Sequence, residues 1–323
     1  MNAYLVITID VEPDCTPSWQ YSDPLEFKGV STGIKERLQP LFIKHGITPT
    51  YLINNVVLEN EESVKVFSSL EGKFELGSHL HPEFMEPQKS FTNYAGKRGL
   101  ANSCEYPSNI EFEKIKNITK LFVDSFNYKP TSFRAGRFSA GPNTIQSLHT
   151  LGYKIDTSVT PHVTWNDKTR KKPVDYANAK EQPYFIKNET ILQEDKNGAI
   201  LQVPVSIVKK PAGIVGEIKR TFFGLRSPLK KMKSVWLRPV YSSNSELQFV
   251  VNDLWDRYQQ EKIVVFNMMF HNVEVMPGLS PYSKTESDCD VYLNQLAAFF
   301  QFCKTKNIQS VALTDLYDIQ KGK

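Results

Sequence analysis

Short runs of β-branched and aromatic residues alternate along the whole chain with segments of helical periodicity, and this alternation constrains the fold most. It is typical of βα units, whose parallel strands form a central sheet. The expected strands cover residues 4–10, 49–53, 74–79, 132–134, 154–157, 200–205, 263–270 and 310–313. The expected helices cover residues 33–45, 110–126, 143–151, 247–260 and 290–305, the first and third of them ending at Gly46 and Gly152.

Seven or eight such units fit a closed barrel better than an open sheet. The sequence therefore predicts an α/β fold, a distorted (β/α) barrel with seven or eight parallel strands. A barrel of this kind often forms one unit at this length, so residues 1–323 are expected to be a single catalytic domain. Two segments depart from the alternation and are expected to be insertions, a polar one at 160–190 and a basic one at 209–238.

The net charge of +4 is unevenly distributed, because residues 209–238 hold nine Lys or Arg and one acid. Aromatic and apolar residues, among them Phe222, Phe223, Leu225 and Trp236, lie between these cations. The segment is either a solvated basic face or a surface that contacts an anionic membrane or a phosphate-bearing glycan carrier. No helix–turn–helix or zinc-finger pattern accompanies it, which argues against nucleic-acid binding.

The N-terminus has no signal-peptide pattern, and no apolar run approaches the roughly 18 residues needed to cross a bilayer. The four cysteines, at 15, 104, 289 and 303, form no CxxC pair, which argues against a disulfide scaffold or a zinc knuckle. A cytoplasmic protein is expected.

Ionisable side chains gather where the expected strands end. In a β/α barrel the loops at that edge surround one mouth, so residues far apart in sequence can share a pocket. The residues concerned are Asp10, Glu12, His79, His81, Arg134, Arg137, Asp156 and His271.

Asp10 and Glu12 are two residues apart, and so are His79 and His81. In an extended segment this spacing places both side chains of a pair on the same side. One carboxylate of Asp10 and Glu12 could hold a cation while the other takes a proton, or the pair could be an acidic strand end. His79 and His81 could be metal ligands or capped core histidines. Glu83 is either a substitute ligand or a solvated acid.

An arginine beside an aspartate keeps the carboxylate ionised and oriented, a role open to Arg134 and Arg137, although either could be a surface arginine. His271 follows an almost wholly apolar strand that would deliver it to the barrel mouth as a general acid. A helix cap or a core hydrogen bond is its alternative role. The histidines at 45, 149 and 162 are expected to be structural.

In order along the chain, these pieces resemble the polysaccharide deacetylase superfamily, the NodB-homology or carbohydrate esterase family 4 group. The matching segments are residues 8–12 (TIDVE), 76–82 (LGSHLHP), 133–136 (FRAG), 152–158 (GYKIDTS) and 266–271 (FNMMFH). Two features differ from the family pattern, since Val11 separates carboxylates that are usually adjacent, and the histidines are two rather than four apart. The resemblance is to a divergent branch linked to surface-polysaccharide biosynthesis.

The resemblance implies a distorted barrel, a divalent metal, most simply zinc, and hydrolysis of acetyl groups. By the same resemblance Asp10 is the catalytic base, Arg134 orients it and His271 is the acid. Glu12, His79 and His81 are then the metal ligands, and Arg137 and Asp156 are expected to contact substrate.

The expected function is metal-dependent removal of an acetyl group from a sugar amide of a glycan or glycan precursor. Two alternatives remain, a cyclic-amide hydrolase of the allantoinase type and a sugar-binding pseudoenzyme without metal.

Overall fold

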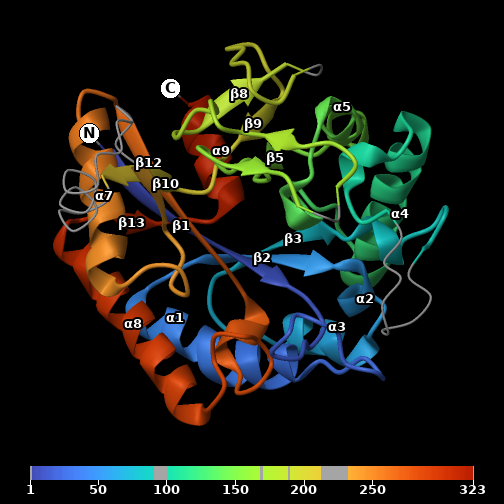
Figure 1. Ribbon diagram of the computed structural model, residues 1–323, viewed down its shortest axis with the longest axis horizontal. Coiled ribbons are helices and arrows are strands. Elements are labelled where there is room, and N and C mark those ends of the chain that lie inside the picture. Colours follow the sequence, from blue (N-terminus) through green and yellow to red (C-terminus); the bar gives the residue numbers. More distant parts are fainter. Residues whose placement is uncertain (1, 91–99, 168–169, 188–189, 212–231, 323) are drawn as a thin grey trace, which may run out of the picture.

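The computed structural model describes residues 2–90, 100–167, 170–187, 190–211 and 232–322. Within them a nine-stranded sheet has the order β12, β1, β2, β3, β4, β5, β9, β8, with β13 beside β1 (Figure 1). All neighbours are parallel except β8 and β9, so eight strands share one direction and the predicted α/β barrel is confirmed. The strands are β1 (Asn2–Val11), β2 (Pro49–Asn54), β3 (Glu75–Leu80), β4 (Ser132–Ala135), β5 (Ile155–Asp156), β8 (Tyr184–Ile186), β9 (Ile200–Gln202), β12 (Ile263–His271) and β13 (Gln309–Ser310).

Helices surround the curled sheet, with α1, α3 and α8 below it in Figure 1, α4 and α5 at the right and α7 at the left. They are η1 (Gly29–Leu38), which continues into α1 (Gln39–His45), α2 (Asn55–Leu58), α3 (Glu61–Ser68), α4 (Ser108–Phe126), α5 (Pro142–Leu151), α7 (Asn244–Tyr258), α8 (Glu286–Thr305) and α9 (Leu313–Lys321). Gly46 (φ 67°) and Gly152 (φ 85°) end α1 and α5 in the left-handed conformation, as predicted. The strand predicted over 310–313 was too long, because Leu313 already opens α9.

The alternation of side chains along β1 separates two buried environments. Ala3, Leu5, Ile7, Ile9 and Val11 belong to the large core that includes residues of the surrounding helices. Tyr4 and Val6 pack instead with residues of β5, β9 and β12 inside the barrel. The next residues on this inward-facing side, toward the carboxyl end of the strand, are Thr8, Asp10 and Glu12, and all three are buried. Because strand side chains alternate with a period of two, the inward face changes from apolar at the base to ionisable at the carboxyl edge.

Hydrogen bonds join the two edges of the curled sheet across the gap between β9 and β12. The backbone N–H of Ser206 donates to the Asn267 carbonyl (3.0 Å). The Asn267 side-chain amide donates to the carbonyls of Val203 and Pro204 (3.2 Å each). Nearer the base, the Gln182 amide takes the place of a strand, accepting from Val265 N–H (2.8 Å) and donating to its carbonyl (3.2 Å).

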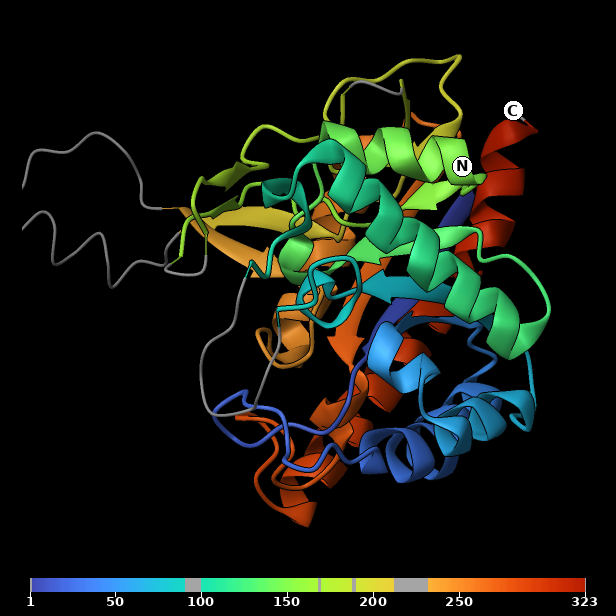
Figure 2. The same cartoon turned by 90° about the vertical axis from the view of Figure 1, so that its right-hand side faces the viewer.

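The two segments expected to be insertions differ in what the structure shows. Residues 160–190 include an antiparallel hairpin of β6 (Thr164–Trp165) and β7 (Val174–Asp175), followed by β8, which joins the main sheet. Of residues 209–238, positions 212–231 lie outside the described residues, and with them most of the predicted membrane-contacting surface. The flanking strands β10 (Ile207–Pro211) and β11 (Met232–Trp236) form a hairpin that projects on the side toward which the central strands point (Figure 2).

The prediction for the basic segment was wrong at Arg238. This last cation of the segment is buried and ion-paired with Glu274, so it belongs neither to a solvated face nor to a membrane-facing one. Among the described helices, none is long and apolar enough to serve as a bilayer-spanning segment.

Candidate metal and catalytic site

The strand register brings the predicted residues to one edge of the sheet. Asp10 near the end of β1 lies opposite His271, the last residue of β12. His79 near the end of β3 lies opposite Arg134 on β4. Since β1, β3, β4 and β12 are all parallel, their carboxyl ends meet, as the sequence predicted.

Glu12, His79 and His81 converge on one point. Glu12 Oε1 lies 3.2 Å from His79 Nε2 and 3.0 Å from His81 Nε2, and the two Nε2 atoms are 3.1 Å apart. An ion about 2.0–2.2 Å from three tetrahedrally placed ligands would separate them by about 3.3–3.6 Å, close to these spacings. Histidine, cysteine and acidic side chains are the usual metal ligands. Among the described residues, these three are the group of such side chains placed closely enough to hold one ion.

The outer nitrogens of both imidazoles have partners that leave the inner nitrogens for a ligand role. His79 Nδ1 lies 3.1 Å from the Arg134 carbonyl, which can only accept, so Nδ1 carries the proton and Nε2 a lone pair. His81 Nδ1 faces the Tyr21 hydroxyl (3.4 Å) and the Glu83 carboxylate (3.6 Å). A second shell of this kind orients histidine ligands in zinc proteins, so the donor set fits a zinc-type ion.

Glu12 is fixed through both its backbone and its carboxylate. Its backbone N–H donates to Asn272 Oδ1 (2.9 Å), and its carbonyl accepts from Asn272 Nδ2 (3.0 Å). The Tyr21 hydroxyl donates to Oε2 (3.2 Å), which leaves Oε1 facing the imidazoles. Burial alone would raise the pKa of Glu12, but His81 and His79 hold it well below its ordinary value, so the carboxylate is anionic, the form that binds cations.

Asp10 is held by a fully buried arginine. Arg134 Nη1 donates to Asp10 Oδ1 (2.6 Å), while its other nitrogens donate to the Thr8 hydroxyl (2.7 Å) and the Thr157 carbonyl (2.9 Å). Burial raises the pKa of Asp10, but Arg134 and two neighbouring histidines outweigh it and leave the pKa lowered. Oδ2, the oxygen of Asp10 not bound by Arg134, is 3.9 Å from the Nε2 atoms of His79 and His271.

His271 faces the same point from β12. Its Nε2 lies 3.9 Å from Asp10 Oδ2 and 3.8 Å from Glu12 Oε1. On the other side of the ring, Nδ1 lies 2.9 Å from Glu274 Oε1, which can only accept from it. Arg238 pairs with the same carboxylate. Burial alone would raise the pKa of Glu274, but Arg238 outweighs burial and leaves the pKa lowered. Glu274 therefore orients His271 with Nε2 toward the reacting groups.

These residues open into a cavity of about 350 Å³ with an aromatic rim. The rim residues come from distant segments and are Trp19, Tyr21, Phe138, Trp165, Tyr241 and Tyr282. Three of the lining residues, Trp19 (φ 57°), Arg137 (φ 52°) and Phe138 (φ 53°), adopt the left-handed backbone conformation that non-glycine residues rarely occupy. Such backbone strain is typically tolerated at functional sites, where it directs side chains that the fold would otherwise point elsewhere.

The two residues expected to contact substrate differ in position. Arg137 lines the cavity and pairs with Glu83 (2.7 Å). Asp156 is wholly buried, hydrogen-bonded to Ser158, and lies outside the cavity lining; burial raises its pKa to about 6. Glu83 is fully buried rather than solvated, and its contacts with Arg137 and His81 make it a support for the site.

Several residues of the site were not identified from the sequence. Glu274 had a usable signal, since it follows His271 by three residues, a spacing that lets a carboxylate reach back to the ring. Asn272, Arg238 and Tyr21 had none. Asn272 and Arg238 contact partners 260 and 36 positions away, and Tyr21 reaches Glu12 across a segment without helix or strand periodicity.

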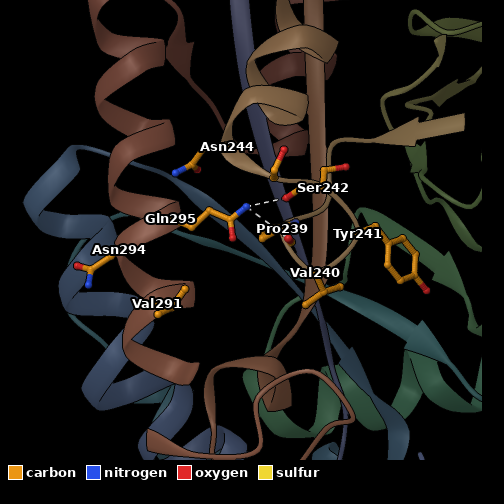
Figure 3. Close-up of a pocket in the computed structure, with 9 residues that line it drawn as sticks. Pro239, Val240, Tyr241, Ser242, Asn244, Val291, Asn294 and Gln295 are labelled. Atoms are coloured by element: carbon orange, nitrogen blue, oxygen red, sulfur yellow. Dashed lines mark hydrogen bonds between the residues drawn. The ribbon is translucent and has the colours of Figure 1, made fainter. Parts of the chain in front are cut away.

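A second depression, of about 640 Å³, lies between residues 239–244 and α8 (Figure 3). It carries amide and hydroxyl side chains but no carboxylate, imidazole or thiol among the described residues that line it. This depression therefore holds none of the carboxylate and imidazole groups that meet in the first cavity.

No protein-family model matches the chain, and no curated protein sequence matches it. Solved structures do match. One assigned as a polysaccharide deacetylase from Mycobacterium smegmatis has a TM-score of 0.56 at 11% identity, over 100% of this chain and 92% of its own. One assigned as a polysaccharide deacetylase from Pseudomonas aeruginosa PAO1 has a TM-score of 0.54 at 12% identity, over 98% and 89%. Puue allantoinase has a TM-score of 0.53 at 12% identity, over 98% and 88%.

At these identities the likeness establishes the fold. The chain has the fold of the polysaccharide deacetylases, as the sequence motifs indicated.

Proposed function

We propose that the chain is a metal-dependent hydrolase that removes an acetyl group from a sugar amide of a glycan or glycan precursor. The observation that carries this proposal is the convergence of Glu12, His79 and His81 beside the Asp10–Arg134 pair. Two nitrogens and one carboxylate oxygen suit zinc and leave positions for water and substrate. An intact ligand set also favours an enzyme over a pseudoenzyme.

A bound divalent cation would polarise the acyl carbonyl and lower the pKa of the attacking water from 15.7 to about 7. Asp10 then acts as the base through Oδ2, because Oδ1 is occupied by Arg134. Arg134 in turn is fixed by Thr8 and Thr157, which prevents the carboxylate from rotating. General-base catalysis of this type contributes about 10²–10⁴-fold to a rate.

His271 is placed to protonate the departing amine. Its Nε2 faces Asp10 and Glu12 from the end of the neighbouring strand β12, while Glu274 holds Nδ1. Trp19 packs against the imidazole, with ring centroids 5.3 Å apart, and shields it from bulk water. The base and the acid therefore approach the acyl carbon from β1 and β12.

The test is acetate release from N-acetylglucosamine oligomers before chelation, after chelation, and after zinc is restored. The proposal expects activity to disappear with the metal and to return with it. His79→Gln should lose both metal and activity, whereas His149→Gln, on the exposed face of α5, should keep both. Full activity in protein shown to be metal-free would contradict the proposal.

A cyclic-amide hydrolase is the second candidate, supported by the fold shared with Puue allantoinase. The same base and acid could open a cyclic amide. Ring opening of allantoin without acetate release from sugars would favour this candidate.

A further inference from the structure

Arginine side chains form part of the wall of the cavity beside the site. Besides the reacting groups, three arginines line it, Arg137, Arg170 and Arg238, together with one acid, Asp167, which pairs with Arg170. The acids paired with Arg137 and Arg238 are Glu83 and Glu274, which are fully buried and do not line the cavity. Both ion pairs therefore present their positive ends to the cavity and their negative ends to the protein interior.

Two of these arginines have a buried N–H group without an acceptor among the described residues, Nη1 of Arg170 and Nε of Arg238. Arg170 uses its other nitrogens, since Nε donates to Asp167 (3.0 Å) and Nη2 to the Arg137 carbonyl (2.6 Å). Its side chain is only 1% exposed, so bulk water does not satisfy the remaining donor. Buried donors on a charged group are costly unless an acceptor reaches them.

Both guanidinium groups are held in place before any ligand arrives. Arg170 lies over the Trp165 ring (5.6 Å to the centroid) and Arg238 over the Tyr241 ring (4.4 Å). The loop that carries Arg238 and Tyr241 is tethered to α8, because Gln295 donates to the carbonyls of Pro239 and Ser242 (Figure 3). The Tyr241 ring extends from this loop on the side away from Gln295.

We propose that the cavity selects sugars bearing an oxyanion, either the carboxylate of a uronic acid or a phosphate ester, and that Arg170 and Arg238 bind that group. A guanidinium presents its donors in a planar fork that matches carboxylate and phosphate oxygens. An oxyanion supplies acceptors for the two unmet N–H groups and meets the positive ends of the ion pairs. This inference rests on the proposed function in taking a sugar amide as the substrate.

The test compares equilibrium binding of three sugars to metal-loaded Asp10→Asn protein by calorimetry, because this substitution removes the proposed base and so prevents hydrolysis during the titration. They are neutral N-acetylglucosamine, N-acetylglucosaminuronic acid and N-acetylglucosamine 6-phosphate. At least one charged sugar should bind about tenfold or more tightly than the neutral one, and its identity distinguishes carboxylate from phosphate. Added salt should reduce the preference, as expected for charge-assisted contacts.

Arg170→Gln is the informative variant, because its partner Asp167 is 46% exposed and is not left as a buried charge. It should lose most of the preference, while Arg170→Lys should keep part of it. Arg37→Gln is the matched control, since Arg37 lies outside the cavity lining and its partner Glu286 is 59% exposed. A melting curve of each variant separates loss of binding from loss of folding.

Equal binding of the three sugars, binding of none, or an unchanged preference in Arg170→Gln with the fold intact would overturn the inference. Because binding is measured without turnover, it is independent of the proposed chemistry. Absence of acetate release from every sugar would refute the deacetylase proposal, while the binding comparison would still decide the selectivity.

Discussion

His79 and His81 are separated by one residue, and the alternation of an extended chain turns both imidazoles to the same side. Their Nε2 atoms lie 3.1 Å apart, with Glu12 Oε1 within 3.2 Å of both. Two ring nitrogens at this distance are held together by a proton on one of them or by a cation between them. A spacing of two residues on a strand therefore places two nitrogens where one ion could bind both, although it departs from the spacing usual in the family that the sequence resembles.

The proposed function assigns Asp10 a role in catalysis but none in holding the metal, so an experiment can separate the two roles. Asp10→Asn keeps the shape of the side chain and its contact with Arg134 but removes the basic oxygen, so acetate release should fall by about 10²-fold or more while bound metal is unchanged. Acetate release and elemental analysis of the same sample check this. Asp124→Asn, in an exposed i,i+4 pair on α4, is the control and should change neither. Loss of the metal from Asp10→Asn would show that Asp10 is a ligand instead.

At the scale of the elements, the carboxyl ends of β1 and β12 are joined by one side chain. The Asn272 amide accepts from Glu12 N–H and donates to the Glu12 carbonyl, so it acts as a short continuation of the strand ladder. Glu12 lies one residue past the end of β1, where the regular ladder stops. The position of this ligand therefore depends on the neighbouring strand.

Asn272→Ala should lower zinc affinity by about 10–100-fold, because it frees the backbone of a ligand without removing any ligand. Competition with a chelator measures the affinity. Asn244→Ala, an exposed change on α7, should leave it unaltered. An unchanged affinity in Asn272→Ala would mean that β1 alone positions Glu12.

Glu181 joins the segment before β8 to α7 through His162, Arg257 and Tyr258. Burial raises the pKa of Glu181, but hydrogen bonds from His162 and Arg257 prevail and lower it to about 2, from 4.5 in the unfolded chain. A carboxyl group whose pKa falls on folding stabilises the protein above its unfolded pKa. That stabilisation is lost as the pH falls from 4.5 toward about 2.

Glu181→Gln should therefore lower the free energy of unfolding by about 1–2 kcal/mol above pH 4.5, a value reduced because Arg257 is 41% exposed. The gap between wild type and variant should narrow at lower pH. Denaturant unfolding across this range measures it, with the exposed change Glu113→Gln as control. A gap that stays constant with pH would contradict the assignment.

The elements that the sequence predicted well are those with a strong local pattern. The apolar runs of β1 and β12 and the capped helices α4, α5 and α8 were located within a few residues. The short helices α2 and α3 were not, since four and eight residues leave too little periodicity to detect. The sequence did not predict the left-handed conformation of Arg137 and Phe138, because positive φ values are rare for both residue types.

The candidate site depends on closure of the barrel. The predicted residues other than Asp156 were found together because parallel strands share one edge, a rule that needs no knowledge of distant contacts. The arginines and aromatic residues of the cavity were not found as a group, because Arg170, Arg238 and Trp19 meet only through the loops that cross the mouth. Residue types and spacing were therefore enough to propose the chemistry, whereas the proposed selectivity could be inferred only from the folded loops.

Gln182 contributes to that closure by pairing with both backbone groups of Val265. Gln182→Ala would leave a strand N–H and a carbonyl without partners, at a cost of about 1–3 kcal/mol of unfolding free energy. Denaturant unfolding measures the loss, and Gln146→Ala on the exposed face of α5 is the control. A cost no larger than that of the control would show that the barrel closes without this bridge.

The proposed chemistry depends on one ion held jointly by side chains at the carboxyl ends of β1 and β3. Anomalous scattering at the zinc edge from crystals of zinc-loaded protein tests this directly. The expected result is a peak about 2.0–2.2 Å from the Glu12 carboxylate and the Nε2 atoms of His79 and His81. A map at full zinc occupancy with its peak elsewhere, or with no density between these three side chains, would contradict it.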